Sequence, residues 1–298
     1  MILVTGGHGF VGKALMGALR KNYHDTEIIA PTSKELDLLN SEKTLAFFHE
    51  HQIDCVFHLA ARLGGVGLVS NKPLEFLESN LLINYNILRA SLTSGVKKFI
   101  TLGSSCSYSV DAPLPNRESD LWHGHPENTY GICKLVLLEH LISQTNMDWA
   151  YLIPPNIYGP GDHFGEKDAH FIPATVMKFQ NALRENVDEI EVWGDGMQTR
   201  DFVYIDDMVY FLISAFENKE YSKKAVNVGT GIEVTIKEVV ENIQSVMGLT
   251  GKVKINWAPD KPTGGKRKVF CNEALLQIEP NYRFVGIREG LERTLKNI

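Results

Sequence analysis

The clearest chemical signature in this chain is a tyrosine followed four residues later by a lysine, Tyr130 and Lys134. On a helix this spacing places the phenol and the ammonium on one face, one turn apart. A nearby ammonium favours the phenolate, so we expect Lys134 to lower the pKa of Tyr130 toward working pH. Many surface helices carry such a pair, which makes it a weak signal alone. Beside a dinucleotide site it indicates hydride transfer at a carbonyl-bearing carbon.

A glycine-rich segment near the N-terminus supplies the matching site. Gly6, Gly9 and Gly12 have the GxxGxxG spacing, after a predicted strand, Ile2 to Thr5, and at the start of a predicted helix, Val11 to Asn22. Small residues there let backbone amides approach a pyrophosphate and let the helix pack close to the strand. A tight glycine turn without a ligand is the alternative reading.

The end of the second predicted strand, Glu27 to Ala30, bears on the choice between NAD and NADP. An acidic residue there would accept a hydrogen bond from the adenosine ribose 2′-hydroxyl. The next acid in this chain is Glu35, and Ser33 and Lys34 precede it. We therefore expect NADP(H), with Ser33 and Lys34 toward the 2′-phosphate. An ordinary solvated lysine is the alternative.

Two further segments carry groups that could move protons. Ser104 and Cys106 follow a predicted strand, Lys97 to Leu102, at the sheet edge where open α/β sheets bind ligands. A serine there can share a substrate oxygen with Tyr130. A lone cysteine is more often a small buried hydrophobe. His170 stands just before a predicted helix, and a lone histidine is more often structural or solvated.

The first half of the chain alternates short apolar strands with helical stretches, which predicts a doubly wound parallel sheet with helices on both faces. His58, at the end of one strand, reads as a structural residue near the cofactor. The other elements expected in this half are helices at Ser41 to His51, Leu74 to Ser94 and Thr129 to Gln144, with Ser41 as a cap, and strands at Asp54 to His58 and Trp149 to Ile153.

After Pro154 and Pro155 the pattern loosens, with an irregular loop expected at 159–170. Thr235 and Glu238 have capping-box spacing. The elements expected here are helices at 172–185, 203–216, 235–247 and 286–297 and strands at 189–193 and 226–229. We therefore expect an α/β fold with a Rossmann domain at 1–155 plus about 200–230, and a smaller α/β lobe at about 156–199 plus 231–298 that covers the strand ends.

Composition excludes several classes of protein. The 298 residues are 44% hydrophobic, and no apolar run approaches the roughly 20 residues that span a bilayer. Met1 to Val4 run straight into glycines without a charged segment, so no signal peptide is expected. Four scattered cysteines without a CxxC pair argue against a metal site and fit a reducing cytosol. A net charge of −6 argues against a broad nucleic-acid surface.

Together these segments resemble the extended short-chain dehydrogenase/reductases, and within them the GDP-fucose synthase branch. The triplet at 104–106, HFIP at 170–173 and VWG at 192–194 are the segments most specific to that branch. The matching segments run nearly end to end: 2–15, 33–39, 58–66, 103–108, 130–134, 154–164, 170–174, 192–196, 200–208, 227–231 and 261–268.

The resemblance implies NADPH-dependent 3,5-epimerisation and 4-reduction of a GDP-4-keto-6-deoxy sugar. It implies a catalytic triad of Ser104, Tyr130 and Lys134, and an epimerisation acid/base pair of Cys106 and His170. Substrate contacts are implied at Lys178, Trp193 and Arg200. Cofactor contacts are implied at Gly6, Gly7, His8, Gly9, Phe10, Val11, Gly12, Ser33, Lys34, Leu38, Lys134, Pro154, Asn156, Ile157 and His170.

Three departures from the branch bear on the identity of the sugar. Lys178 stands where many members have arginine, Thr263 where many have aspartate, and Pro155 where threonine is common. Three rivals stay open: an enzyme for another GDP-linked sugar such as a 6-deoxy-heptose, an NAD-dependent 4-epimerase, and a non-catalytic dinucleotide sensor. The resemblance also implies a homodimer through the helices at 74–94 and 129–144.

Overall fold

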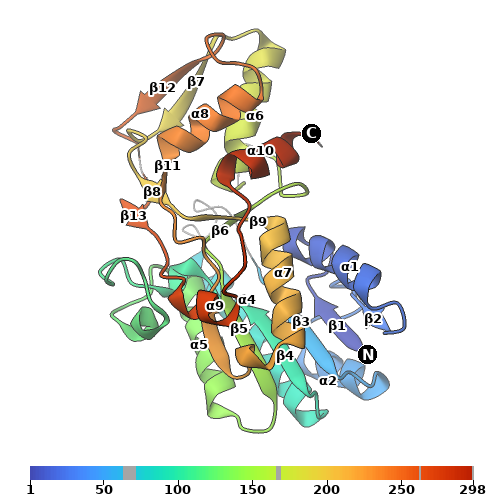
Figure 1. The fold of residues 1–298 in the computed structure, drawn as a ribbon. Coiled ribbons are helices and arrows are strands. Elements are labelled where there is room, and N and C mark those ends of the chain that lie inside the picture. Colours follow the sequence, from blue (N-terminus) through green and yellow to red (C-terminus); the bar gives the residue numbers. More distant parts are fainter. Residues whose placement is uncertain (63–71, 166–168, 262, 297–298) are drawn as a thin grey trace.

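A six-stranded parallel sheet forms the base of the molecule in a computed structural model that describes the chain except for residues 63–71, 166–168, 262 and 297–298. Its strand order is β10-β5-β4-β3-β1-β2, so the chain winds outward in both directions from the middle (Figure 1). The strands are β1 (Ile2–Thr5), β2 (Ile28–Ile29), β3 (Cys55–His58), β4 (Lys98–Leu102), β5 (Asp148–Ile153) and β10 (Lys224–Asn227).

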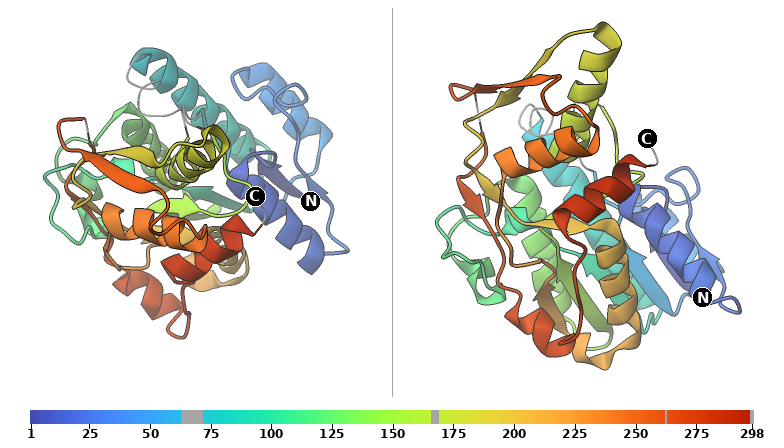
Figure 2. Two further views of the ribbon diagram at one scale, coloured as in Figure 1. Left: turned by 90° about the horizontal axis from the view of Figure 1, so that it is seen from above. Right: turned by 45° about the horizontal axis from the view of Figure 1, so that its top comes forward.

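Helices cover both faces of this sheet, as Figures 1 and 2 show. Successive strand side chains point to opposite faces. Ile2 and Val4 accordingly belong to one hydrophobic core, beneath α1 and α7, whereas Leu3 belongs to a second core beneath α2, α4 and α5. This is the doubly wound fold that the alternation of strands and helices predicts. The bounds are α1 (Phe10–Asn22), α2 (Ser41–Glu50), α4 (Pro73–Thr93), α5 (Thr129–Ser143) and α7 (Ile205–Glu217).

The remaining elements stand mainly over the carboxyl ends of the sheet strands (Figure 1). β7 (Glu189–Trp193) pairs in parallel with β12 (Lys254–Ala258), and β8 (Thr199–Arg200) lies between β11 (Val234–Thr235) and β13 (Arg267–Lys268). β6 (Asn156–Tyr158) pairs with β9 (Phe202–Tyr204). The helices are α6 (Phe171–Glu185), α8 (Ile236–Val246), α9 (Glu273–Ile278) and α10 (Ile287–Leu295), with 3₁₀ turns η1 (Ser105–Ser107), η2 (Glu118–Trp122) and η3 (Lys219–Tyr221).

Two local predictions are wrong. The cap of α2 is Asn40 and not Ser41, because the Asn40 side chain accepts a hydrogen bond from the Lys43 amide at 2.9 Å. The expected helix at 203–216 begins as a strand, β9, before α7 starts at Ile205. Residues 202–204 are buried on all sides, and in such a run apolar periodicity does not separate strand from helix.

Other predictions are confirmed or lie partly outside the described residues. The capping box of α8 is present, since Thr235 accepts from the Glu238 amide at 3.1 Å and Glu238 accepts from the Thr235 amide at 2.7 Å. The described part of the expected loop at 159–170 contains no helix or strand. Residues 63–66, 166–168, 262 and 297 of the expected segments lie outside the described residues. No described helix is long and apolar enough to cross a bilayer.

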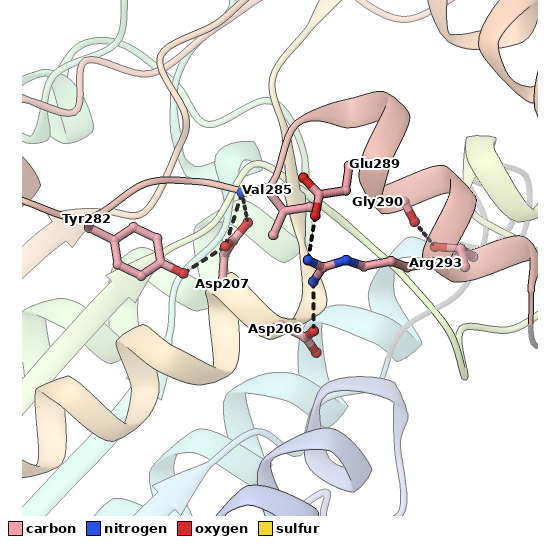
Figure 3. Close-up of polar contacts among 8 residues, drawn as sticks. Asp206, Asp207, Tyr282, Val285, Glu289, Gly290 and Arg293 are labelled. Atoms are coloured by element: carbon pink, nitrogen blue, oxygen red, sulfur yellow. Dashed lines mark hydrogen bonds and ion pairs between the residues drawn. The ribbon is translucent and has the colours of Figure 1, made fainter.

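The C-terminal segment is held against the first turn of α7 by hydrogen bonds and an ion pair (Figure 3). The buried Asp207 carboxylate accepts hydrogen bonds from the Tyr282 hydroxyl at 2.7 Å and the Val285 amide at 3.2 Å, and burial raises its pKa. Arg293 of α10 bonds Glu289 on its own helix and lies 3.7 Å from a carboxylate oxygen of Asp206. The segment with Tyr282 and Val285 connects α9, beside the large sheet, to α10.

We predict that Gly290→Ala loosens the packing of α10. An added methyl group would lie 2.0 Å from the Tyr158 hydroxyl oxygen, so α10 or the buried Tyr158 ring must shift, and such overpacking costs about 1–3 kcal/mol. Urea denaturation measures the free energy of unfolding. Gly286→Ala, at the cap of the same helix, is the matched control because nothing lies within 4 Å of its added methyl group. Equal stability of the two variants would contradict the prediction.

Candidate active site

The glycine loop closes too tightly to hold side chains. Gly6 has φ +71°, and a methyl group at Gly12 would lie 2.1 Å from the Gly6 carbonyl oxygen. Gly9 stands at the N-cap of α1 without a capping side chain, and the first turn of α1 carries no acid. The N-terminal amides of α1 are therefore free of side-chain competitors, which suits a pyrophosphate. The loop fits a dinucleotide.

The other residues of this loop that are expected to contact the cofactor lie beside the N-terminus of α1. Gly7 packs against Ala30 at the end of the second-strand region, where an added methyl group would come within 2.6 Å of the Ala30 side chain. The exposed His8 ring lies 2.9 Å from the Ala30 carbonyl oxygen. Phe10 and Val11 are half-buried against the core.

The segment after β2 leaves a lysine and a serine available. The Glu35 carboxylate accepts hydrogen bonds from the Thr32 amide at 2.7 Å and the Thr32 hydroxyl at 2.9 Å, and these bonds lower its pKa. Glu35 is thereby held within its own turn, whereas Ser33 and Lys34 are exposed. Leu38 is buried, and its carbonyl accepts a hydrogen bond from the Asn86 side chain at 2.8 Å.

The first turn of α5 packs directly onto η1. A methyl group at Gly131 would lie 2.0 Å from the Cys106 carbonyl oxygen, and that carbonyl also accepts a hydrogen bond from the Glu127 amide at 3.0 Å. The Asn128 side chain caps α5 by accepting from the Gly131 amide at 3.0 Å. Ser104 caps η1 in the same way, with its hydroxyl oxygen 3.1 Å from the Cys106 amide. No sequence pattern indicated the contact of Asn128 with Gly131 or that of Glu127 with Cys106.

Ser104, Cys106, Tyr130 and Lys134 thus come from two segments that touch. Ser104 and Cys106 are half-buried at the carboxyl end of β4, and Tyr130 is half-buried one residue before the Gly131 contact. The Lys134 ammonium lies 5.5 Å from the centroid of the Tyr130 ring, as the spacing of one helical turn predicts.

The predicted direction of the Tyr130 pKa shift is wrong. Burial raises the pKa of the phenol well above its ordinary value, and the Cys106 and Cys133 thiols add to that shift. Burial also lowers the pKa of Lys134 to about 8. Desolvation disfavours the charged form of each group and is the largest cause of both shifts. The structure therefore holds Tyr130 as a neutral phenol, which is a proton donor.

A buried polar network links the glycine loop to this helix. His58 lies between the Thr5 hydroxyl, at 2.8 Å from Nδ1, and the Asn84 side-chain oxygen, at 3.1 Å from Nε2. Asn84 in turn donates to the Cys133 carbonyl at 3.2 Å. Because Asn84 accepts from His58, Nε2 carries the proton and Nδ1 accepts from Thr5. Burial, with the Lys134 charge, lowers the pKa of His58 to about 3, so the ring stays neutral.

His170 is exposed at the N-cap of α6. Its Nδ1 atom lies 3.3 Å from a carboxylate oxygen of the buried Asp162, and this hydrogen bond raises the pKa of the imidazole. A raised pKa favours the protonated imidazole, which can act as an acid. Among the described residues no contact joins His170 to Cys106, so their convergence on one ligand stays a prediction.

The residues expected near the nicotinamide end lie on and beside β6. Pro154 is buried, and Pro155 and Ile157 are half-buried. Asn156 donates from its amide, at 3.3 Å, and its side chain, at 3.0 Å, to the Asp201 carbonyl. These contacts fix Asn156 against β9.

Two of the three residues expected to contact the substrate donate hydrogen bonds to Glu191. The Lys178 ammonium donates to the Glu191 carbonyl at 2.8 Å, and the Trp193 indole donates to the Glu191 carboxylate at 3.1 Å. Trp193 is 51% exposed, so its ring is open to a ligand. Arg200 lies on β8, half-buried, and burial lowers its pKa. Thr263 packs against Gly194 in the turn after Trp193.

The comparisons with known proteins show the family of this chain. The model of the NAD dependent epimerase/dehydratase family matches residues 2–229. The chain belongs to this family. It is 34% identical to the GDP-L-fucose synthase of Escherichia coli K12, over 98% of this chain and 94% of that protein. It is 32% identical to the GDP-L-colitose synthase of Yersinia pseudotuberculosis, over 98% and 96%.

A solved structure shares the whole fold of this family member. The crystal structure of a GDP-L-fucose synthetase from Naegleria fowleri bound to NADP has a TM-score of 0.87 and 25% sequence identity, and it covers 99% of this chain and 91% of that one. The resemblance to the extended short-chain dehydrogenase/reductases is therefore confirmed.

Lys134 makes the stability of the protein depend on pH. Its folded-state pKa of about 8 lies below the ordinary 10.5, so between these values the unfolded chain binds more protons and the wild type gains stability as pH rises. We predict that Lys134→Met is more stable than the wild type at pH 7, and that the gap narrows by about 1 kcal/mol per pH unit above pH 8.

Urea denaturation at pH 7, 8 and 9 measures this gap. The same substitution at Lys252, which is exposed, controls for the loss of a lysine as such. A gap that stays constant with pH would show that the Lys134 ammonium is not desolvated.

Proposed function

We propose that this protein is an NADPH-dependent nucleotide-sugar epimerase/reductase that converts GDP-4-keto-6-deoxy-D-mannose to GDP-L-fucose. The observation that carries the proposal is the packing of the Cys106 loop onto the first turn of α5. It brings a hydroxyl, a thiol, a phenol and a buried ammonium to the carboxyl edge of one parallel sheet. The names of the similar proteins support the same chemistry.

The sugar ketone would lie between Ser104 and Tyr130. A 4-ketone acidifies the hydrogens on C3 and C5, because loss of either proton leaves an enolate with its charge on the C4 oxygen. Hydrogen bonds from the Ser104 hydroxyl and the Tyr130 phenol stabilise that oxygen as its charge develops. The raised pKa of Tyr130 suits this role, since a phenol that stays protonated can donate.

Inversion of a carbon needs an acid and a base on opposite faces of the ring. We assign the base to the Cys106 thiolate and the acid to His170, because the hydrogen bond to Asp162 raises the pKa of its imidazole and so favours the protonated form. The base removes a proton from C3 or C5, and His170 returns one from the other face. Tyr130 then protonates the C4 oxygen during reduction.

NADPH would be held by the glycine loop, Ser33, Lys34 and Lys134, and it supplies the hydride for C4. Lys134 is buried, and no hydrogen bond from its ammonium to another described residue is present, which suits a contact to a ribose hydroxyl. The engagement of Glu35 by Thr32 favours the 2′-phosphate form.

We extend the proposal to the division of labour in the chain. Residues 1–155 with about 200–230 bind the cofactor, and about 156–199 with 231–298 bind the nucleotide sugar through Lys178, Trp193 and Arg200. Four free cysteines, Cys106 half-buried and three others buried, are consistent with work in a reducing cytoplasm.

A second candidate is a related enzyme for another GDP-linked deoxy sugar. Lys178 and Thr263 replace the arginine and aspartate common in the branch, and the similarity to a GDP-L-colitose synthase is nearly as high as to a GDP-L-fucose synthase. Lysine offers a point charge where arginine offers a bidentate fork, so the fit to the ligand changes.

One assay tests the function. The protein is incubated in deuterium oxide with NADPH and a panel of GDP-4-keto sugars that includes the 6-deoxy-mannose and 3,6-dideoxy forms. We expect GDP-L-fucose, with deuterium at C3 and C5 and protium at C4, read by NMR. Consumption of NADPH with retained configuration at C3 and C5 would refute epimerisation. A protein that binds NADPH but consumes none with any sugar would be a sensor.

Two variants separate the steps. Tyr130→Phe should lower reduction by about 10²-fold or more, since it removes the proton donor. Cys106→Ser should slow deuterium exchange at C3 and C5 by a similar factor while an already epimerised ketone is still reduced. Exchange at the wild-type rate in Cys106→Ser would show that this thiol is not the base.

We also propose a homodimer through α4 and α5. These helices pack together and expose Leu82, Tyr85 and Val136, which line a largely apolar hollow with Asn84 and His140. Two copies would bury this face in a four-helix bundle. Sedimentation velocity should give a dimer for the wild type and a monomer for Leu82→Arg with Val136→Arg. Leu183→Arg, on the exposed side of α6, is the control and should stay dimeric.

A further inference from the structure

The Glu127 carboxylate connects the part of the site beside the large sheet to the smaller lobe. Glu127 lies in the loop before α5, and its carboxylate forms an ion pair with the Lys268 ammonium on β13. The two side chains are only 27% and 21% exposed, so solvent screens the pair less than an ordinary surface pair.

The partner of Glu127 stands beside a second cation. Lys268 is the register partner of Arg200 in the parallel pairing of β13 with β8. Paired residues on neighbouring strands project from the same face, and like charges there repel. Glu127 offsets that repulsion, because its charge pairs with Lys268 and also acts on Arg200, where it opposes the lowering of the pKa by burial.

The backbone of the same residue is fixed to the catalytic loop. The Glu127 amide donates to the Cys106 carbonyl at 3.0 Å, and the next residue, Asn128, caps the helix that carries Tyr130. Glu127 thus contacts the Cys106 turn through its backbone amide, and it contacts Lys268, beside Arg200, through its carboxylate.

We propose that Glu127 is a positioning residue that couples binding of the substrate's diphosphate beside Arg200 to the placement of Cys106. The inference rests on the proposed function for the identity of the substrate. A diphosphate near Arg200 and Lys268 competes with the carboxylate for the cations and repels it. Because the peptide of Glu127 is bonded to the Cys106 carbonyl, the position of the loop responds to that ligand.

Glu127→Gln keeps the shape of the side chain and removes its charge. It should lower KM for the GDP-keto sugar, since one negative charge near the diphosphate is gone. It should also lower the rate of deuterium exchange at C3 and C5 by about tenfold or more, because the thiol is less well placed. A residue that only stabilises the fold would not lower KM.

The chain offers a matched control. Arg117 and Glu273 form another ion pair, at 2.8 Å, between the segment that leads to α5 and the C-terminal part of the chain. This pair is exposed, and among the described residues it does not contact Cys106 or Arg200. Glu273→Gln removes an equivalent charge and should leave KM and the exchange rate at wild-type values.

Alkylation of Cys106 tests the coupling without turnover. Iodoacetamide labelling of the native protein, with and without GDP, is followed by peptide mass spectrometry; Cys55, Cys133 and Cys271 are buried and act as internal references. In the wild type and Glu273→Gln, GDP should change the Cys106 labelling rate by about fivefold or more. In Glu127→Gln the GDP effect should disappear while thermal unfolding shows a folded protein.

The outcomes separate the two proposals. An equal GDP effect in wild type and Glu127→Gln, or no GDP effect in the wild type, would overturn the coupling. If the labelling results hold but no GDP-keto sugar is consumed, the proposed function fails and the coupling from the nucleotide subsite to Cys106 stands.

Discussion

The close approach of α5 to the 3₁₀ turn η1 is the constraint on which the rest of the site depends. At Gly131 the helix lies so near the Cys106 carbonyl that no side chain fits between them. The Asn128 cap starts the helix at this point, and the Ser104 cap starts the turn. Each cap satisfies backbone donors that would otherwise be unpaired. The phenol, the serine hydroxyl and the thiol are therefore placed by backbone packing.

Desolvation sets the charge states in this site more than pairing does. Lys134 and Tyr130 share a helix face, yet burial drives both toward their neutral forms. His58, also buried, stays neutral beside Lys134 and holds the glycine-loop strand to α4 and α5. His170 is the opposite case, since it is exposed and its hydrogen bond to Asp162 favours the charged form. A phenol that stays protonated and an imidazole whose protonated form is favoured suit an acid-assisted reaction at a ketone.

The two parts of the molecule are joined by buried carboxylates. Asp201 accepts hydrogen bonds from the Thr230 hydroxyl at 2.6 Å and the Gly231 amide at 3.1 Å, while its own carbonyl holds Asn156. Asp207 binds the C-terminal segment to α7. A buried carboxylate is costly unless its oxygens are bonded, so these acids lock the chain into one arrangement. Arg200 precedes Asp201 in the chain, so the hydrogen bonds of Asp201 also restrict the position of Arg200.

The sequence by itself determined the parallel sheet, its helices, the glycine loop and the pairing of Tyr130 with Lys134, because these follow from local periodicity and spacing. It did not determine β9 or β12, since these strands form only with a partner distant in the chain. It also did not determine the cap at Asn40, because Asn and Ser are about equally favoured as caps and stand side by side there. Only the tertiary structure decided that Tyr130 stays protonated, that Glu127 contacts Lys268, and that Asp162 raises the pKa of His170. Burial and contacts between residues far apart in the chain control the protonation of these groups, and neither can be inferred from the local sequence.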